Sequence, residues 1–257
     1  MGRASTPSSS VRAARRQRGG KHRAARVGPT PGGRGWWPVP VAVVLIAVGL
    51  STCGWLAWEY VGSTVVAHHR QRELVTDLHE QWRSSGGDGR PGVGDSDGSG
   101  DVVTGPWGTA FAIVRIPAFG PDYAVPVLRG TGDEQFATGF GQFPDSADPG
   151  ERGNLVLGAH RITHGEPLRD LPDLDPGDEV IVETREATYV YELDSNSLEV
   201  SSSESWPVAS PLAVPVGAAD LAPVGPATIT LITCASLFHT DERSVAFGHL
   251  AEVERSR

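Results

Sequence analysis

An uncharged apolar run near the N-terminus divides this chain into two parts of different character. Residues 36–58 form 23 consecutive positions without a charged side chain, dominated by Val, Ala, Leu, Ile and Trp. A helix of that length crosses the roughly 30 Å hydrocarbon core of a bilayer, whereas the apolar part of a cleaved signal peptide is normally only about 7 to 15 residues. Tryptophan rings collect at membrane interfaces, and the run has them at both ends: Trp36, Trp37, Trp55 and Trp58. We therefore predict one transmembrane helix over 36–58.

The distribution of charge predicts how this helix is oriented. The 35 residues before it contain nine Lys or Arg and no acid, which places the N-terminus in the cytoplasm. Their Gly, Ser, Pro and Arg content indicates a disordered tail, 1–35, that touches anionic lipid. Of 22 basic residues in the chain, 13 follow the span together with all 31 acidic ones, a formal charge of −18. We expect an exported domain, single-pass and anchored in the cell membrane, that does not bind nucleic acid.

Composition divides the exported part into three segments. Residues 59–83 are rich in helix formers with apolar side chains among charged ones, which predicts a membrane-proximal helix. Residues 84–106 are mostly Gly, Asp and Ser, and such a segment cannot offset its ordering entropy by burial, so we predict a flexible linker. About 150 residues remain, enough for one domain with its own core over 107–254.

The pattern of that domain is mostly β. Short β-branched runs are separated by Gly, Pro and Asp clusters, as expected of a closed β-barrel or a sandwich. The expected strands are 111–116, 124–128, 154–159, 179–183, 188–193, 198–200, 228–233 and 244–250. A short helical turn is expected within 167–174. The sequence has no P-loop, dinucleotide-binding or HExxH motif, so it shows no sign of nucleotide-phosphate binding, dinucleotide binding or zinc-dependent proteolysis.

Cys234 is the only cysteine outside the apolar run, since Cys53 lies inside it. Exported domains normally pair their cysteines, so a single thiol indicates an intermolecular bridge, a reactive group or a small buried hydrophobe. The nucleophile is the thiolate, so catalysis also requires a base or a cation nearby. Spacing alone does not choose the base, because catalytic partners meet in space rather than in sequence. The domain offers four histidines: His160, His164, His239 and His249.

Two of these histidines also raise the question of a metal. His160 and His164 are four residues apart, a spacing that binds zinc on a helix. Gly158, Gly165 and Pro167 argue against a helix there, and the sequence shows no third ligand. We therefore expect no metal site and no cofactor.

Several segments together resemble the sortases, the cysteine transpeptidases of Gram-positive cell surfaces. The run Thr230-Leu-Ile-Thr-Cys234, with Arg243 nine residues downstream, matches their TLxTC signature. The run Asn154-Leu-Val-Leu-Gly-Ala-His160-Arg161 resembles the segment that carries their histidine. Within the family the resemblance is closest to class E, the actinobacterial housekeeping type, and it implies a closed sortase-like β-barrel of about eight strands. Other matching pieces are Ile116-Pro117, Phe119 to Tyr123, Arg169-Asp170-Leu171 and Pro176 to Glu179.

The resemblance also implies a catalytic site. Cys234 would attack the carbonyl group of a threonine in an LAxTG- or LPxTG-like sorting signal and form a thioester. His160 would protonate the departing glycine amine and later take a proton from the incoming amine. Arg243, charged at any relevant pH, would stabilise the negative charge that develops on the intermediate. Tyr123 matches the tyrosine linked to LAxTG preference in class E, a substrate-binding role, and can equally be a packed barrel aromatic.

In such a mechanism the thioester is resolved by an amine of a peptidoglycan precursor. The partners implied are surface proteins with a C-terminal sorting signal and that precursor amine. Two positions depart from the usual class E pattern: Gly158-Ala159 reverses the Ala-Gly before the histidine, and Ala235-Ser236 replaces the His-Pro that often follows the cysteine. Other readings are a different membrane-anchored cysteine peptidase, an L,D-transpeptidase, or a catalytically silent surface-binding barrel.

Overall fold

The computed structural model describes residues 38–58, 62–86, 101–215, 223–234 and 241–256. The predicted tail 1–35, most of the predicted linker and residues 235–240, which include Ala235-Ser236 and His239, lie outside these ranges. Helix α1 spans Pro38–Ala57. Its window Val39–Leu56 has a mean hydropathy of 2.1 and is long and apolar enough to cross a membrane. The large apolar side chains of α1 are exposed, as those of a lipid-facing helix must be.

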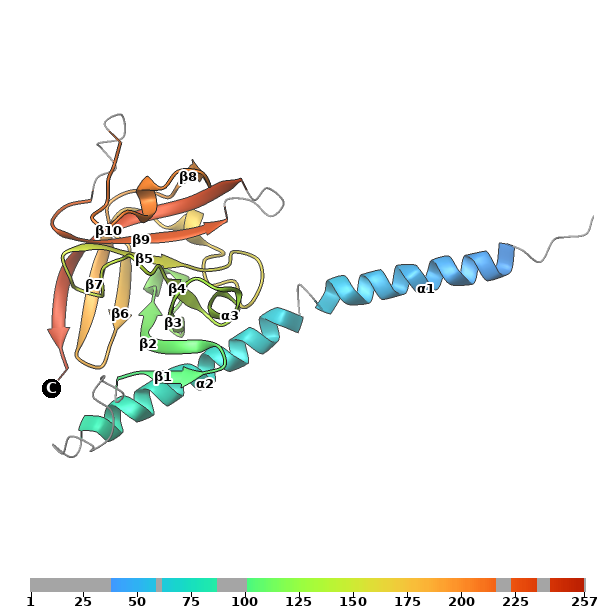
Figure 1. Cartoon of the computed structure of the whole chain (residues 1–257), viewed down its shortest axis with the longest axis horizontal. Coiled ribbons are helices and arrows are strands. Elements are labelled where there is room, and N and C mark those ends of the chain that lie inside the picture. The colour runs from blue at the N-terminus through green and yellow to red at the C-terminus, as the bar shows by residue number, and fades with distance from the viewer. Residues whose placement is uncertain (1–37, 59–61, 87–100, 216–222, 235–240, 257) are drawn as a thin grey trace, which may run out of the picture. The chain divides into compact units, whose positions relative to one another are not determined.

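The strands of the described residues form one sheet, and eight of them close into a barrel (Figure 1). Strand β6 returns to pair antiparallel with β2, with Ile113 opposite Glu183, which completes the ring and leaves no free edge there. The predicted closed barrel of about eight strands is therefore confirmed. In order around the ring the strands are β2 (Gly108–Arg115), β3 (Val125–Arg129), β4 (Phe140–Gln142), β5 (Gly153–Gly158), β9 (Ala227–Cys234), β10 (Glu242–Arg255), β7 (Ala187–Leu193) and β6 (Glu179–Glu183).

In the part of the domain that the structure describes, two further strands and four short helices accompany the ring. Strand β1 (Val103–Gly105) pairs with β2, and β8 (Leu198–Ser201) pairs with β10, both outside the ring. The short helices are η2 (Pro117–Phe119), α3 (Asp133–Phe136), η3 (Leu171–Asp173) and η4 (Trp206–Val208). Each of the eight predicted strand ranges overlaps an observed strand, and η3 lies in the range where a helical turn was expected. The prediction missed β1 and β4, which have only three residues each.

The interior of the barrel is filled by apolar side chains that alternate along the strands. Leu155 and Leu157 of β5 face inward together with Ile229 and Leu231 of β9, and all four are at most 1% exposed. Tyr191 is also fully buried, and its hydroxyl oxygen accepts a hydrogen bond of 2.8 Å from the backbone N–H of Gly150. Burial raises the pKa of Tyr191 to about 12, so this phenol stays neutral.

Helix α2 (Ser63–Gly86) packs on the outside of the barrel against β1, β2 and β3 (Figure 1). Leu74 and Leu78 are 1% and 0% exposed, and Leu78 packs in a cluster with Ile113 and Leu128. Burying a leucine side chain contributes roughly 1.5 to 3 kcal/mol. The predicted membrane-proximal helix is thus attached to the barrel by a small core of its own.

Hydrogen bonds also hold the C-terminal end of α2. The side chains of Gln81 and Trp82 donate to the carbonyl oxygens of Val102 and Asp101 at 2.9 and 3.0 Å. Helix α2 therefore reaches into one end of the range 84–106, expected to be a linker, and β1 occupies the other end. Both ends of that range are consequently attached to the folded domain.

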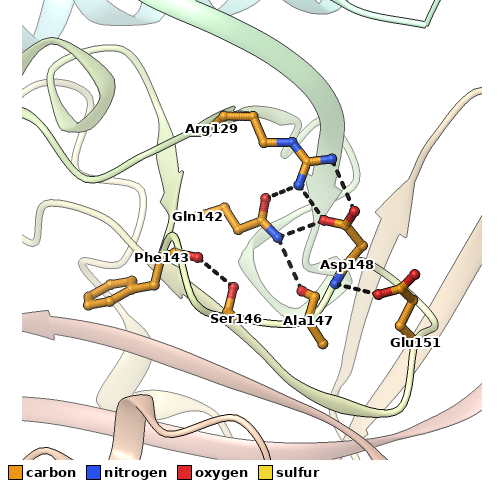
Figure 2. Close-up of polar contacts among 7 residues, drawn as sticks. All are labelled: Arg129, Gln142, Phe143, Ser146, Ala147, Asp148 and Glu151. Atoms are coloured by element: carbon orange, nitrogen blue, oxygen red, sulfur yellow. Dashed lines mark hydrogen bonds and ion pairs between the residues drawn. The ribbon is translucent and has the colours of Figure 1, made fainter. Parts of the chain in front are cut away.

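The connection that leads into β5 is held by a charged network at the end of β3 (Figure 2). Arg129 forms an ion pair with Asp148 and donates to Oε1 of Gln142 at 2.5 Å. The Gln142 amide in turn donates to Asp148 at 3.0 Å and to the Ala147 carbonyl oxygen at 3.1 Å. Burial raises the pKa of Asp148, but hydrogen bonds from Arg129 and Gln142 outweigh it, so the pKa lies below its usual value. The loop before β5 is thus fixed by an ionised carboxylate.

Candidate active site

The ends of two antiparallel strands bring Cys234 and Arg243 together. Cys234 is the last residue of β9 and Arg243 the second residue of β10, and the two are directly opposite each other in the ladder. Residues opposite each other in a sheet project from the same face, about 5 Å apart. The thiol of Cys234 is free and half-buried. The Arg243 guanidinium donates to the Glu242 carbonyl oxygen at 3.1 Å, so the side chain bends back over the start of β10.

His160 reaches the same place from the other side of β9. Strands β5 and β9 are parallel neighbours with Gly158 opposite Ile232. Their pairing continues past the end of β5, because Ala159 N–H donates to the Ile232 carbonyl oxygen at 3.2 Å and the Thr233 hydroxyl donates to the Ala159 carbonyl oxygen at 2.8 Å. One residue further along the same register, His160 falls level with Cys234 at the ends of the two strands. Since Ala159 belongs to the interior cluster, alternation directs His160 to the outer face.

A second guanidinium also approaches the end of β9. Arg161, directly after His160, donates from Nη1 to the Cys234 carbonyl oxygen at 3.5 Å. This contact links the chain after β5 to the backbone of the cysteine. The resemblance to sortases implies a role for Arg243 rather than Arg161, and the structure brings both arginines to the ends of these strands.

The imidazole of His160 contacts two other rings. The Phe136 ring, from α3, meets it edge-on with centroids 6.0 Å apart, and the His164 ring stacks on it with centroids 4.9 Å apart and 26° between the planes. Burial lowers the pKa of His160, and the charge of His164 lowers it further, while Asp133 acts in the opposite direction. At neutral pH His160 is therefore a neutral group that can accept a proton.

The segment after His160 is not helical. His164 and Glu166 both have positive φ angles, 55° and 50°, and Gly165 between them has a φ of 85°. The helical arrangement that would let His160 and His164 share a zinc ion is thus not formed. Across the described part of the chain, no three His, Cys, Asp or Glu side chains gather in a group that could hold a metal ion.

Tyr123 lies on the loop after η2 and contacts the segment that carries His160. Its hydroxyl group donates to the Pro167 carbonyl oxygen at 2.7 Å, and its ring meets Phe119 edge-on at 5.2 Å. Burial, and then the negative charge of Asp170, raise the pKa of Tyr123 well above its usual value, so the phenol remains a donor. Tyr123 also lines a cavity of about 440 Å³ together with His68 of α2 and Asp170. The structure does not bring Tyr123 into the strand ladder that joins Cys234 and Arg243.

A buried amide fixes the two parallel strands that carry His160 and Cys234. The Asn154 side chain is 0% exposed, and its oxygen accepts hydrogen bonds from the hydroxyl groups of Thr228 and Thr230 at 3.3 and 2.9 Å. Its nitrogen donates to the carbonyl oxygens of Pro207 and Ala209 at 3.2 and 3.0 Å. Because all of these groups are paired, the amide specifies one register of β5 against β9.

Sequence reasoning missed the groups that surround His160. Asp133 and Phe136 lie on α3, more than twenty residues upstream, and no periodicity or motif marks them. The sequence offered His164 as one of four candidate bases and as a possible metal ligand, not as a neighbour of the His160 ring. Its spacing of four residues from His160 was the available signal, and the structure turns that spacing into a ring stack.

Comparison with known proteins decides the family. The family model for the sortase domain matches residues 114–251, more than half of the chain. The chain belongs to the sortase family. This sortase is 28% identical to Sortase SrtE1 of Streptomyces coelicolor over 228 residues, which cover 84% of the chain but only 58% of that relative.

Solved structures agree with this assignment. The sortase superimposes on Sortase E1 from Streptomyces coelicolor, solved with a tripeptide in the active site, with a TM-score of 0.50 and 29% identity, over 60% of this chain and 94% of that one. Sortase E from Streptomyces avermitilis gives a TM-score of 0.50 and 29% identity over 57% of this chain and 90% of that one. Within the family the sortase is close to class E, and these similarities indicate a cysteine transpeptidase. Sortases are membrane-anchored, and α1 fits that anchor.

Proposed function

We propose that this sortase cleaves a sorting signal at the C-terminus of a surface protein, between Thr and Gly, and joins the protein to an amine of a cell-wall precursor. The observation that supports it is the strand register: Cys234 and Arg243 are opposite each other at the ends of β9 and β10, and His160 follows directly after the end of β5, the other neighbour of β9. A nucleophile, a proton carrier and a fixed cation are the groups that acyl transfer through a thioester requires.

The first half of the reaction forms the thioester. The thiol proton of Cys234 passes to His160, whose lowered pKa leaves it neutral and able to accept it. The thiolate attacks the threonine carbonyl carbon, and the charge that develops on the carbonyl oxygen is stabilised by the guanidinium of Arg243. As the C–N bond breaks, His160 returns its proton to the departing glycine amine. The products are an acylated Cys234 and a free peptide that begins with glycine.

The second half transfers the acyl group. An incoming amine loses a proton to His160 as its nitrogen attacks the thioester carbonyl carbon, and Arg243 again faces the oxyanion. Collapse of this intermediate breaks the C–S bond, and the cysteine sulfur takes the proton back from His160. Resolution by an amine rather than by water makes the enzyme a transpeptidase instead of a peptidase.

Similarity to class E relatives supports a proposal for the signal. We propose an LAxTG- or LPxTG-like sequence, with Tyr123 as a substrate-binding residue. Tyr123 lines the cavity of about 440 Å³ beside the segment that carries His160, which supports this role. We further propose that α1 crosses the membrane with the N-terminus in the cytoplasm, that the part of 84–106 between α2 and β1 forms the linker, and that the catalytic domain, which includes 107–254, acts outside the cell.

Peptide transfer by the full-length chain in detergent micelles tests the proposal. The enzyme is incubated with LAxTG and LPxTG peptides and an amine, and the products are identified by mass spectrometry. Transfer of the acyl fragment to the amine, absent from the Cys234→Ala variant, supports a sortase. Hydrolysis alone indicates a peptidase, a cross-link between added stem peptides indicates an L,D-transpeptidase, and no reaction of Cys234 with peptide or thiol reagent indicates a silent barrel; each of these overturns the proposal.

A further inference from the structure

The stack between His160 and His164 joins a proton carrier to a second titratable ring. The centroids are 4.9 Å apart and the planes are 26° from parallel, so the two rings overlap face to face. Of these two histidines, the reaction proposed above uses only His160.

The backbone that presents His164 is costly. His164 and Glu166 adopt left-handed φ angles of 55° and 50°, and a non-glycine residue in that region costs roughly 1 kcal/mol or more. Gly165, between them, takes its φ of 85° without such a cost. A hydrogen bond of 3.0 Å from Glu166 N–H to the Thr163 carbonyl oxygen closes the turn. A chain keeps two strained residues in one turn only where its surroundings hold them.

Helix α2 holds this turn from outside. Nε2 of His68 donates to the Gly165 carbonyl oxygen at 3.0 Å, and Nε2 of Gln71 donates to the His164 carbonyl oxygen at 3.5 Å. Gln71 is only 4% exposed, and Leu74, one turn further along the helix, is 1% exposed. The turn is therefore fixed to a helix that is itself packed on the barrel.

The ring of His164 takes its orientation from this turn and from the stack. Its Nδ1 atom is buried and has no hydrogen-bond partner among the residues that the structure describes. A histidine placed to stabilise the fold normally pairs its buried ring nitrogens, because an unpaired polar atom costs free energy. His164 forgoes that stabilisation, while its flat face covers His160.

We propose that His164 is a positioning residue: its imidazole, stacked on His160, fixes the orientation of the His160 ring and makes the protonation of His160 depend on the charge beside it. The reason for the coupling is electrostatic, since two positive rings at this separation repel each other. This inference rests on the proposed function, because it gives His164 a purpose only if His160 transfers protons.

Two charged groups act on the pKa of His160: His164 on the same segment and Asp133 on α3. The strand register also brings Cys234 of β9, with Arg243 of β10 opposite it, to this end of the sheet. The pKa of His160 is lowered first by burial and next by His164, and is raised by Asp133. Removal of the His164 charge should therefore raise the pKa of His160.

Two variants of His164 separate the stack from the charge. His164→Phe keeps a flat ring and removes the titratable nitrogens, and His164→Ala removes both. His69→Ala is the matched control, because His69 is an exposed histidine of α2 whose partner is Glu73 rather than the active-site turn. Each variant is made in the full-length chain, in micelles. The titration of each imidazole is followed by ¹H–¹³C NMR, with the His160 signals assigned from their loss in His160→Gln.

The proposal predicts different results for the two variants. In His164→Phe the midpoint of the His160 titration should rise, because the like charge beside it is removed, with transfer at its optimum pH nearly retained. In His164→Ala transfer should also fall, by roughly tenfold, because the ring is less well oriented. His69→Ala should match the wild type in both measurements.

An unchanged His160 midpoint in both His164 variants would overturn the coupling. Equal transfer rates for His164→Ala and the wild type would overturn the positioning role. The NMR titration needs no turnover, so it decides the coupling even if the wild type transfers no acyl group. That last result would count against the proposed function instead.

Discussion

At the scale of single residues, the free thiol of Cys234 is the group whose removal should have the largest effect. We expect Cys234→Ala to abolish both the acyl-enzyme and the transfer product, because no other described group beside His160 can form a thioester. Intact-protein mass spectrometry after addition of peptide measures the acyl-enzyme. Cys53→Ala is the matched control, since the only other cysteine lies in α1, and it should retain transfer. Retained transfer in Cys234→Ala would refute the nucleophile.

Arg243 is expected to act through the shape of its guanidinium as well as its charge. A lysine at this position keeps the charge but loses the planar fork of donors that meets a developing oxyanion. Loss of an oxyanion donor typically costs about 3 to 4 kcal/mol, so Arg243→Lys should lower kcat roughly a hundredfold to a thousandfold. Steady-state transfer kinetics measure this. Arg161→Lys is the comparison, because Arg161 donates to a backbone carbonyl oxygen. A larger loss of kcat in Arg161→Lys than in Arg243→Lys would mean that Arg161, rather than Arg243, stabilises the oxyanion.

Asp133 should set where activity falls on acidification. Its charge raises the pKa of His160, against the stronger lowering by burial and His164. In Asp133→Asn the pKa of His160 should therefore fall further, and the acidic limb of kcat/KM should move to lower pH. The acidic limb of the wild-type kcat/KM profile should have its midpoint below the ordinary histidine pKa of about 6.5. A pH profile of kcat/KM for both proteins tests this, and an upward movement of the limb would contradict it.

At the scale of elements, the sequence predicted strands well where they are long and β-branched. The runs that became β5 and β9 were both expected, and their parallel pairing brings the ends that lead to His160 and Cys234 to the same edge of the sheet. Strand β4, Phe140–Gln142, was missed because three residues with a central glycine carry no alternation to detect. Yet β4 is part of the ring, since it joins β3 to β5. Ring closure is a property of pairing between distant segments, which local pattern does not encode.

The candidate site likewise contains residues that could be predicted from the sequence and residues that could not. Cys234, His160 and Arg243 follow from a motif in which strand ends carry the reacting groups, so similarity was enough to name them. Asp133 is placed near His160 only by α3, whose position depends on how the chain returns from β3 to β4. Nothing in the sequence around Asp133 indicates that this residue lies near His160. The tuning of His160 could therefore be found only in three dimensions.

A substitution in helix α2 tests whether this element is held on the barrel by its buried leucine. Leu78 is 0% exposed and packs against Ile113 and Leu128 of the barrel wall. Truncation of a buried leucine to alanine typically costs about 2 to 5 kcal/mol, so Leu78→Ala should lower the free energy of unfolding by that amount. Val65→Ala, on a residue of α2 that is 63% exposed, should change it by less than about 0.5 kcal/mol. Denaturant titration followed by tryptophan fluorescence compares the two, and equal effects would mean that α2 is not held by this cluster.

At the scale of the whole molecule, the packing of α2 decides where the catalytic domain begins. A soluble fragment from Trp107 onward corresponds to the predicted domain but lacks both α2 and β1. It would expose the cluster around Ile113 and Leu128, and it would lose the hydrogen bonds from His68 and Gln71 to the turn after His160. A fragment from Ser63 keeps all of these contacts.

We therefore expect the Ser63 fragment to match the full-length chain in melting temperature and transfer rate, and the Trp107 fragment to fall short in both. The loss of stability follows from the apolar surface returned to water, at roughly 25 cal/mol for each Å². The loss of rate follows from the turn, since its two left-handed residues would relax once the helix that holds them is gone. Calorimetry and peptide transfer on the three proteins measure these effects. If the Trp107 fragment were as stable and as active as the full chain, α2 would be a stalk that rests on the barrel without supporting its active site.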